Sequence, residues 1–227
     1  MRLEILGTRG NIRPSAPNYT RHSGILVDGR ILLDLGEVAY LGYRPRQVFI
    51  THLHPDHAAF LRSEVVTDAP IYLPEPTRKL PSGRVMSRPV RSGPHRIVAV
   101  PTVHSPTVRS VGYVVEKGGR RVFFSSDLVS IEQRYHRRLR RLDLVITEGS
   151  YLRRGGLVRT DPATGRRFGH AGIPDLVEFF RRFTSRIVVT HFGSWFYQDI
   201  AASIRRIASL GDGVRTSAAH DGLVITV

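Results

Sequence analysis

The chain has 227 residues, a formal net charge of +15 and no cysteine. The absence of cysteine excludes disulfides, thiolate metal ligands and thiol nucleophiles, so any metal must be held by histidine and carboxylate side chains. The hydrophobic fraction of 41% is ordinary for a globular protein, and the length suits a single domain over residues 1–227. No apolar run approaches the length of a membrane span and no signal peptide precedes the first strand, so we expect a cytoplasmic protein without a membrane partner.

Arginine supplies almost all of the positive charge, because Lys79 and Lys117 are the only lysines. A field of this sign attracts polyanions and favours nucleic acid or phosphorylated substrates. The arginine bias is equally compatible with genome composition or adaptation to heat. The charge alone therefore does not decide whether a polyanion is the substrate.

Short strands and tight turns are predicted for the first part of the chain. Residues 2–6 have the alternating pattern of a strand, and Asp28-Gly29 predicts a hairpin turn between strands at 24–27 and 30–35. The β-branched and aromatic run at 48–50 predicts one more buried strand, directly before the most polar loop of this region.

That loop, residues 51–57, reads Thr-His-Leu-His-Pro-Asp-His and holds three imidazoles and a carboxylate within six residues. Pro55 forbids a continuous helix here, so we expect a loop at a strand end. Neutral imidazole and ionised carboxylate are good ligands for a borderline ion such as zinc. Four of them on one tight loop favour a metal site over a run of solvated histidines.

The rest of the chain alternates apolar strand-like runs with helical patterns, which predicts an α/β protein with two similar β-rich halves. Further strands are predicted at residues 71–73, 97–103, 111–116, 121–125, 144–147, 187–189 and 223–227. Helices are predicted at residues 58–64, 131–142, 173–183 and 199–210. The helix at 131–142 is rich in arginine and has either a solvated face or a contact with a phosphate backbone.

Three other features have more than one interpretation. Residues 74–94, rich in Pro, Gly, Ser and Arg, form either a surface connection or a lid over the site. His22 either lies on the surface or faces a substrate. His220 is either structural, which we expect, or catalytic.

The histidine-rich loop resembles the metal-binding signature of the metallo-β-lactamase superfamily. That family has, in order, an Asp at a strand end, the clustered loop, a lone His, a lone Asp and a final His. The corresponding residues here are Asp34, then His52, His54, Asp56 and His57, then His104, Asp127 and His191. The resemblance covers nearly the whole chain. It implies a four-layer αβ/βα sandwich, with two mixed β-sheets packed face to face and helices outside.

The resemblance also implies two divalent metal ions. One ion would take His52, His54 and His104, and the other Asp56, His57 and His191, with Asp127 shared. Zinc is the default for such ligands, with manganese and iron as alternatives. Retention of Asp56 and His57 favours two metals over the single iron of the dioxygenase members. Asp34 is expected to brace the loop by hydrogen bonds instead of binding metal.

Glu148 and His170 resemble the acid and histidine motifs of the phosphodiesterase branch of the superfamily, such as ribonuclease Z. In that branch the matching His is not a primary metal ligand. The resemblance implies that a metal-bridging hydroxide attacks, with Asp56, Glu148 and His170 as catalytic residues. The chain lacks the long arm with which ribonuclease Z grips tRNA, and it has Pro55 where that enzyme has Gly. It is thus closest to compact phosphodiesterase-like hydrolases.

We therefore predict a dinuclear metal-dependent phosphodiesterase that acts on nucleic acid or on a small nucleotide-like phosphodiester. One alternative is a lactone or carboxylic ester hydrolase, in which Glu148 and His170 would have no obvious leaving-group role. Another is a basic nucleic-acid-binding protein with structural metals. The expected partner is a phosphodiester or other anionic substrate. The sequence leaves the oligomeric state open, with a homodimer among the options.

Overall fold

The structure, a computed structural model, describes all residues 1–227. Its first sheet contains β1 (Arg2–Gly7), β2 (Gly24–Val27), β3 (Ile31–Leu33), β4 (Gln47–Phe49), β5 (Ile71–Leu73), β6 (Arg84–Val85) and β16 (Val224–Thr226). Its second sheet contains β7 (Val90–Ser92), β8 (His95–Thr102), β9 (Ser110–Lys117), β10 (Arg120–Phe124), β11 (Leu144–Gly149), β14 (Arg186–Phe192) and β15 (Arg215–Ala218). A separate hairpin consists of β12 (Leu157–Thr160) and β13 (Arg167–His170).

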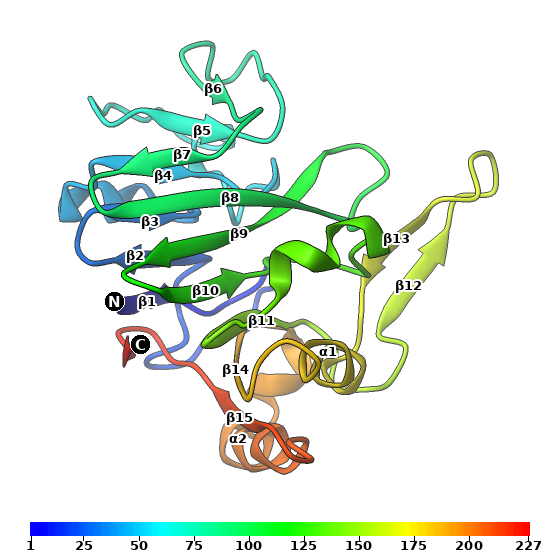
Figure 1. The fold of residues 1–227 in the computed structure, drawn as a ribbon. Coiled ribbons are helices and arrows are strands. Elements are labelled where there is room, and N and C mark those ends of the chain that lie inside the picture. The colour runs from blue at the N-terminus through cyan, green and yellow to red at the C-terminus, as the bar shows by residue number, and fades with distance from the viewer.

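The two seven-stranded sheets pack against each other, and each is mixed (Figure 1). Their strand orders are β16-β1-β2-β3-β4-β5-β6 and β15-β14-β11-β10-β9-β8-β7. In the first sheet the pairs from β16 to β3 are antiparallel and those from β3 to β6 are parallel. The second sheet repeats this division, antiparallel from β7 to β10 and parallel from β10 to β15. The predicted sandwich of two similar halves is therefore confirmed.

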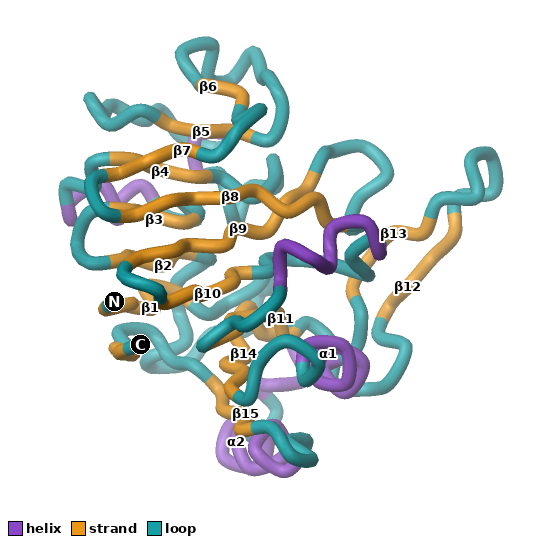
Figure 2. The backbone as a smooth tube through the Cα atoms, in the orientation of Figure 1, coloured by secondary structure: helices purple, strands orange, loops and turns teal.

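Apolar side chains fill three layers. Residues such as Phe49, Tyr113 and Ile146 lie between the two sheets. The outer face of the second sheet is covered by the helices α1 (Ile173–Phe180) and α2 (Ile200–Ser209) (Figure 2). Both helices are predicted from the sequence. The helices that cover the outer face of the first sheet are the short 3-10 helices η1 (Val38–Tyr43) and η2 (Ala59–Leu61), and neighbouring loop residues also pack there. No helix is long and apolar enough to span a membrane.

The predicted helix at 58–64 is wrong in extent, because only three residues form the 3-10 helix η2. The backbone of Ala58 pairs with Leu35 in an isolated β-bridge. The amide of Ala59 donates to Leu35 O at 2.7 Å, and the amide of Leu35 donates to His57 O at 2.8 Å. Attachment to the end of β3 thus keeps this segment extended where a helix would have begun.

The predicted helix at 131–142 is also shorter, a 3-10 helix η3 (Gln133–Leu139). Arg140 has extended backbone angles and Arg141 has a φ of 54°, which ends the helical path. The guanidinium of Arg121 donates to the carbonyl oxygens of Arg138 and Arg140, which occupies acceptors that a continuing helix would use.

The segment 74–94 contains edge strands of both sheets, β6 and β7, and so carries the chain from one sheet to the other.

The hairpin of β12 and β13 is not predicted from the sequence. It stands out from the body of the molecule beside the second sheet (Figure 2).

The turn between β2 and β3 is tied to the second sheet by Asp28. Its carboxylate accepts hydrogen bonds from Lys117 Nζ and His95 Nε2, both at 2.7 Å, and from the Arg2 amide at 2.7 Å. Burial raises the pKa of this carboxyl group, but the hydrogen bonds from Lys117, Arg2 and His95 outweigh it and hold the pKa well below its usual value.

We expect Asp28→Asn to lower the free energy of unfolding at pH 7 by about 1–3 kcal/mol, because hydrogen bonds to a charged group are lost. Asn tolerates the positive φ of 48° at this position. Since the folded-state pKa is depressed, the stabilisation is present above the unfolded value of about 3.9 and disappears as the pH falls through the folded-state pKa. Denaturant unfolding from pH 7 to pH 3 measures the difference. The exposed Asp68→Asn is the control, and equal stability of the two variants at pH 7 would contradict the expectation.

Candidate metal centre

Five strand ends converge at one edge of the sandwich. The loop 51–57 follows β4, His104 follows β8, Asp127 follows β10, Glu148 lies near the end of β11, and His191 near the end of β14. The hydroxyl of Tyr113 donates to Ile50 O at 2.7 Å, which joins the two sheets beside the histidine-rich loop. The fold therefore gathers polar groups that are far apart in the sequence.

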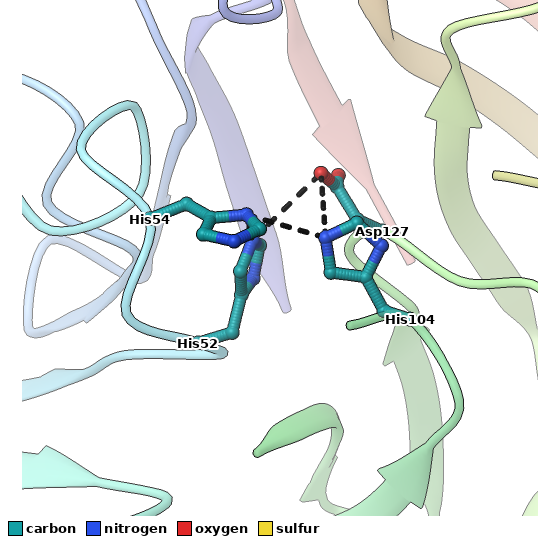
Figure 3. A group of neighbouring side chains, drawn as sticks. All are labelled: His52, His54, His104 and Asp127. Atoms are coloured by element: carbon teal, nitrogen blue, oxygen red, sulfur yellow. Dashed lines mark hydrogen bonds and ion pairs between the residues drawn. The ribbon is translucent and has the colours of Figure 1, made fainter. Parts of the chain in front are cut away.

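The first group of side chains is His52, His54, His104 and Asp127, shown in Figure 3. Their candidate ligand atoms all lie within 4.8 Å of one another. His54 Nδ1 is 3.0 Å from His52 Nε2 and 3.2 Å from His104 Nε2. Figure 3 shows the three rings and the carboxylate directed toward a common point.

The second group is Asp56, His57 and His191, again with ligand atoms within 4.8 Å of one another. His191 Nε2 is 2.9 Å from Asp56 Oδ2 and 3.1 Å from His57 Nε2. Two imidazoles that face each other through nitrogen, with a carboxylate beside them, form a suitable set of ligands for a cation.

Asp127 lies between the two groups. Its Oδ2 is 3.8 Å from both His52 Nε2 and His104 Nε2 and 3.5 Å from His57 Nε2, while Oδ1 is 3.4 Å from His191 Nδ1. Oδ1 is buried and has no hydrogen-bond partner. Because a buried carboxylate oxygen without a partner is costly, this atom fits a site that a cation completes. The two groups with a shared Asp127 suggest a dinuclear metal site.

The protonation equilibria differ between the two groups. Burial, reinforced by His57, lowers the pKa of His52, and burial with His104 lowers the pKa of His54 to about 4. Burial also acts to lower the pKa of His57 and His191, but nearby carboxylates, chiefly Asp127, outweigh it and raise both values. The carboxylates thus favour the protonated forms of His57 and His191, whereas burial favours the neutral forms of His52 and His54.

Asp34 supports the centre without belonging to either group. Its buried carboxylate accepts from His57 Nδ1 at 2.7 Å, from the Thr51 amide at 2.8 Å and from Ser23 Oγ at 3.0 Å. The first of these bonds fixes the ring of His57 and leaves Nε2 for the metal group, as expected for a supporting carboxylate. Asp34 therefore braces the loop by hydrogen bonds, as the sequence predicts.

Three non-glycine residues around the centre have left-handed backbone conformations. The φ angles are 60° at Asp34, 54° at Ser126 and 53° at His191. Such conformations cost of order 1–3 kcal/mol each and persist only where the surrounding structure enforces them. The strand ends are thus held in one geometry before any ligand binds.

Glu148 and His170 form a pair beside Asp127. His170 Nδ1 donates to Glu148 Oε2 at 2.7 Å, and Glu148 Oε1 accepts from the Leu128 amide at 2.8 Å. Burial lowers the pKa of His170, but Glu148 and Asp127 outweigh it and raise the pKa to about 9. The pairing with Glu148 thus favours the protonated form of His170, whose side chain is 23% exposed while that of Glu148 is fully covered.

A pocket of about 330 Å³ opens over the centre. Its wall includes His54, Asp56, Asp127, His170 and His191. It also includes Asn11, Ser150 and Tyr151, for which the sequence offers no spacing signal. Ser150 Oγ lies 3.3 Å from His191 Nδ1.

The two remaining histidines of interest lie away from the centre. His22 is buried and its Nδ1 contacts Glu37 Oε1 at 2.5 Å, so it faces neither bulk solvent nor the pocket. His220 is exposed and contacts only the Asp221 carbonyl through its ring.

Residues 42–192, about two thirds of the chain, match the family model described as the beta-lactamase superfamily domain. The chain belongs to this superfamily. The matched region contains both groups of candidate ligands, together with Glu148 and His170. The family predicted from the histidine-rich loop is thus confirmed, and with it a metal-dependent hydrolase fold.

Solved structures of the same fold cover almost the whole chain. The metallo-β-lactamase fold protein YhfI from Bacillus subtilis has 18% identity and a TM-score of 0.71, over 99% of this chain and 98% of that chain. The short form of human tRNase Z, ELAC1, has 19% identity and a TM-score of 0.64, over 100% of this chain and 99% of that chain. A diphosphatase of the PhnP family has 16% identity and a TM-score of 0.69, over 100% of this chain and 97% of that chain. No curated protein matches the sequence.

Within this superfamily fold, Asp34 offers a test of the metal centre that leaves every candidate ligand in place. We expect Asp34→Asn to weaken zinc binding about 10–100-fold, because the amide cannot stabilise the Nδ1 proton of His57 as the carboxylate does. Competition with a chromophoric chelator measures the affinity. The matched control is Asp68→Asn, which should bind zinc like the wild type. Wild-type affinity in a folded Asp34→Asn protein would show that Asp34 does not support the centre.

Proposed function

We propose that this chain is a dinuclear metal-dependent phosphodiesterase. His52, His54 and His104 would hold one ion, and Asp56, His57 and His191 would hold the other, with Asp127 available to both. Five imidazoles and two carboxylates favour zinc, with manganese or iron as alternatives. The cytoplasmic location expected from the sequence belongs to the same proposal.

The observation that carries the proposal is the Glu148–His170 pair. Both oxygens of Glu148 already accept hydrogen bonds, from Leu128 and His170, so this carboxylate orients and charges the imidazole. Only Nδ1 of His170 is hydrogen bonded within the protein, which leaves Nε2 for a ligand in the pocket. The result is a fixed cationic donor beside the metal groups that is not one of the seven proposed ligands.

Such a donor suits phosphodiester hydrolysis. Two divalent cations held by these ligands would supply Lewis acidity here, which would lower the pKa of water and neutralise phosphoryl charge. A phosphodiester is an anion before reaction and gains further negative charge in the transition state, which cationic His170 can stabilise. Its Nε2 proton can also be transferred to the leaving alkoxide. A neutral lactone or carboxylic ester has less need of this additional cation.

The fold and the net charge both agree with an activity on phosphate esters. The fold is shared with a tRNase and with a diphosphatase, and the chain has a net charge of +15. A fold alone does not choose a substrate, so these similarities only add to the evidence from Glu148 and His170.

The zinc- or manganese-loaded protein is expected to hydrolyse bis(p-nitrophenyl) phosphate and, more slowly, a dinucleotide. His170→Ala should lower kcat for the dinucleotide about 10²–10⁴-fold, because the alkoxide leaving group needs a proton. The loss should be smaller for bis(p-nitrophenyl) phosphate, whose leaving group needs none. Elemental analysis should find two ions in this variant, whereas Asp56→Ala should lose an ion and all turnover.

The exposed His220→Ala is the control and should behave as the wild type. Loss of an ion from His170→Ala would show that His170 is a ligand. No phosphodiester turnover in protein that holds two ions would disprove the proposal. Turnover of a lactone would then support the alternative of an ester hydrolase. No turnover of any of these substrates would support the alternative of a nucleic-acid-binding protein with structural metals.

A further inference from the structure

A second depression, much larger than the metal pocket, lies on the outer side of the second sheet. Its volume is about 1260 Å³, and one of its walls is formed by the metal-site residue His104. Other lining residues come from β8, β9, β10, η3 and the beginning of β13, and from the segments 74–75, 86–89 and 105–109. We call it the arginine groove, because seven of its 28 lining residues are arginines.

The charge of the arginine groove is only partly neutralised. Its carboxylates are Glu75, Glu116 and Glu132. Glu116 is paired with Arg96 at 2.7 Å and Arg121 at 3.1 Å, both of which line the groove. Five further arginines of the groove form no ion pair: Arg88, Arg109, Arg138, Arg166 and Arg167. All except Arg138 are clearly exposed, so the groove presents unpaired guanidinium groups to a ligand.

The strand β13 connects the arginine groove to the metal pocket. Arg167 begins this strand at the groove, and His170 ends it in the pocket. Three residues of extended chain span roughly 10 Å. The strand is fixed to the metal site, because His104 Nδ1 donates to Gly169 O at 2.9 Å and the Gly169 amide donates to His104 O at 2.6 Å. A ligand that crosses β13 can therefore contact both places.

The sizes of the two depressions indicate which kind of ligand would use both. A small phosphodiester would fit the pocket of about 330 Å³ and would leave the arginine groove unused. A stiff duplex cannot bring a backbone phosphate down to ligands as buried as His52, His57 and Asp127. A flexible single strand can do so while its neighbouring phosphates remain in the groove.

We propose that the arginine groove binds a single-stranded nucleic acid on one side of the scissile phosphodiester, with Arg166 and Arg167 as phosphate-binding residues. The inference deepens the phosphodiesterase function proposed above and rests on it. It makes a polynucleotide strand, instead of a small cyclic or nucleotide diester, the substrate of the metal centre. Binding to arginines should depend steeply on salt, since each neutralised phosphate releases counterions.

The test is binding of a fluorescein-labelled oligothymidylate of about 12 nucleotides, a length that one single-strand site can cover. Fluorescence anisotropy with the metal-loaded protein gives Kd at several salt concentrations. The double variant Arg166→Ala/Arg167→Ala should raise Kd roughly 10-fold or more at 0.1 M salt and reduce the slope of log K against log salt by about 1.4. The wild type should bind a duplex of the same length more weakly.

The matched control is Arg205→Ala/Arg206→Ala, which removes the same charge from exposed positions on α2, outside the groove. It should retain wild-type Kd and salt slope. Equal losses in both double variants would show that only the overall charge matters. An unchanged Kd in Arg166→Ala/Arg167→Ala, or preferential binding of duplex, would overturn the inference.

The binding measurement separates this inference from the proposed catalytic function. Turnover of bis(p-nitrophenyl) phosphate without binding that depends on Arg166 and Arg167 would overturn only the role of the arginine groove. Groove-dependent binding without phosphodiester turnover would overturn the phosphodiesterase function and leave a single-strand-binding groove.

Discussion

The buried carboxylate of Asp127 is the group on which the rest of the site depends. It lies within 4 Å of nitrogen atoms from four histidines that come from both metal groups, and one of its oxygens has no hydrogen-bond partner. A buried charge is costly unless it is paired, and at this place only protonated imidazoles or bound cations can pair it. Cations between the two groups would pair this carboxylate and leave the imidazoles neutral, which is the form that binds a metal.

The fold meets this requirement through the strand ends. Parallel pairing of β10, β11 and β14 brings the ends of all three strands to one edge, where Asp127, Glu148 and His191 are located. Asp34 and the left-handed residues at this edge hold the ligands in one geometry. The opposite end of the sandwich has a separate polar tie, from Asp28 to His95 and Lys117. This tie at Asp28 is thus separate from the groups around the metal centre.

Much of the site could be predicted from the sequence, because its signals are local. Three histidines and an aspartate on the loop 51–57 indicate a metal site, and apolar runs mark the strands that end at His104, Asp127 and His191. The structure brings all seven predicted ligands together and pairs Glu148 with His170 as expected. Their roles as ligands and catalysts remain predictions.

The remaining features depend on tertiary contacts that leave no local pattern. The bridge between Leu35 and Ala58 shortens the helix predicted at 58–64. The guanidinium of Arg121 donates hydrogen bonds to carbonyl groups at the end of the helix predicted at 131–142. His22 is buried by its contact with Glu37, which lies fifteen positions away. The arginine groove combines residues from segments that are far apart in the sequence, so only the fold shows that Arg88, Arg109 and Arg167 surround one depression.

Anomalous X-ray diffraction from crystals of the zinc-loaded protein would test the dinuclear centre most directly. We expect two zinc peaks about 3.5–4 Å apart, the separation typical of two-metal sites. One should lie among His52, His54 and His104, the other among Asp56, His57 and His191, with the Asp127 carboxylate between them. A single peak, or a second ion that Asp127 does not contact, would contradict the account.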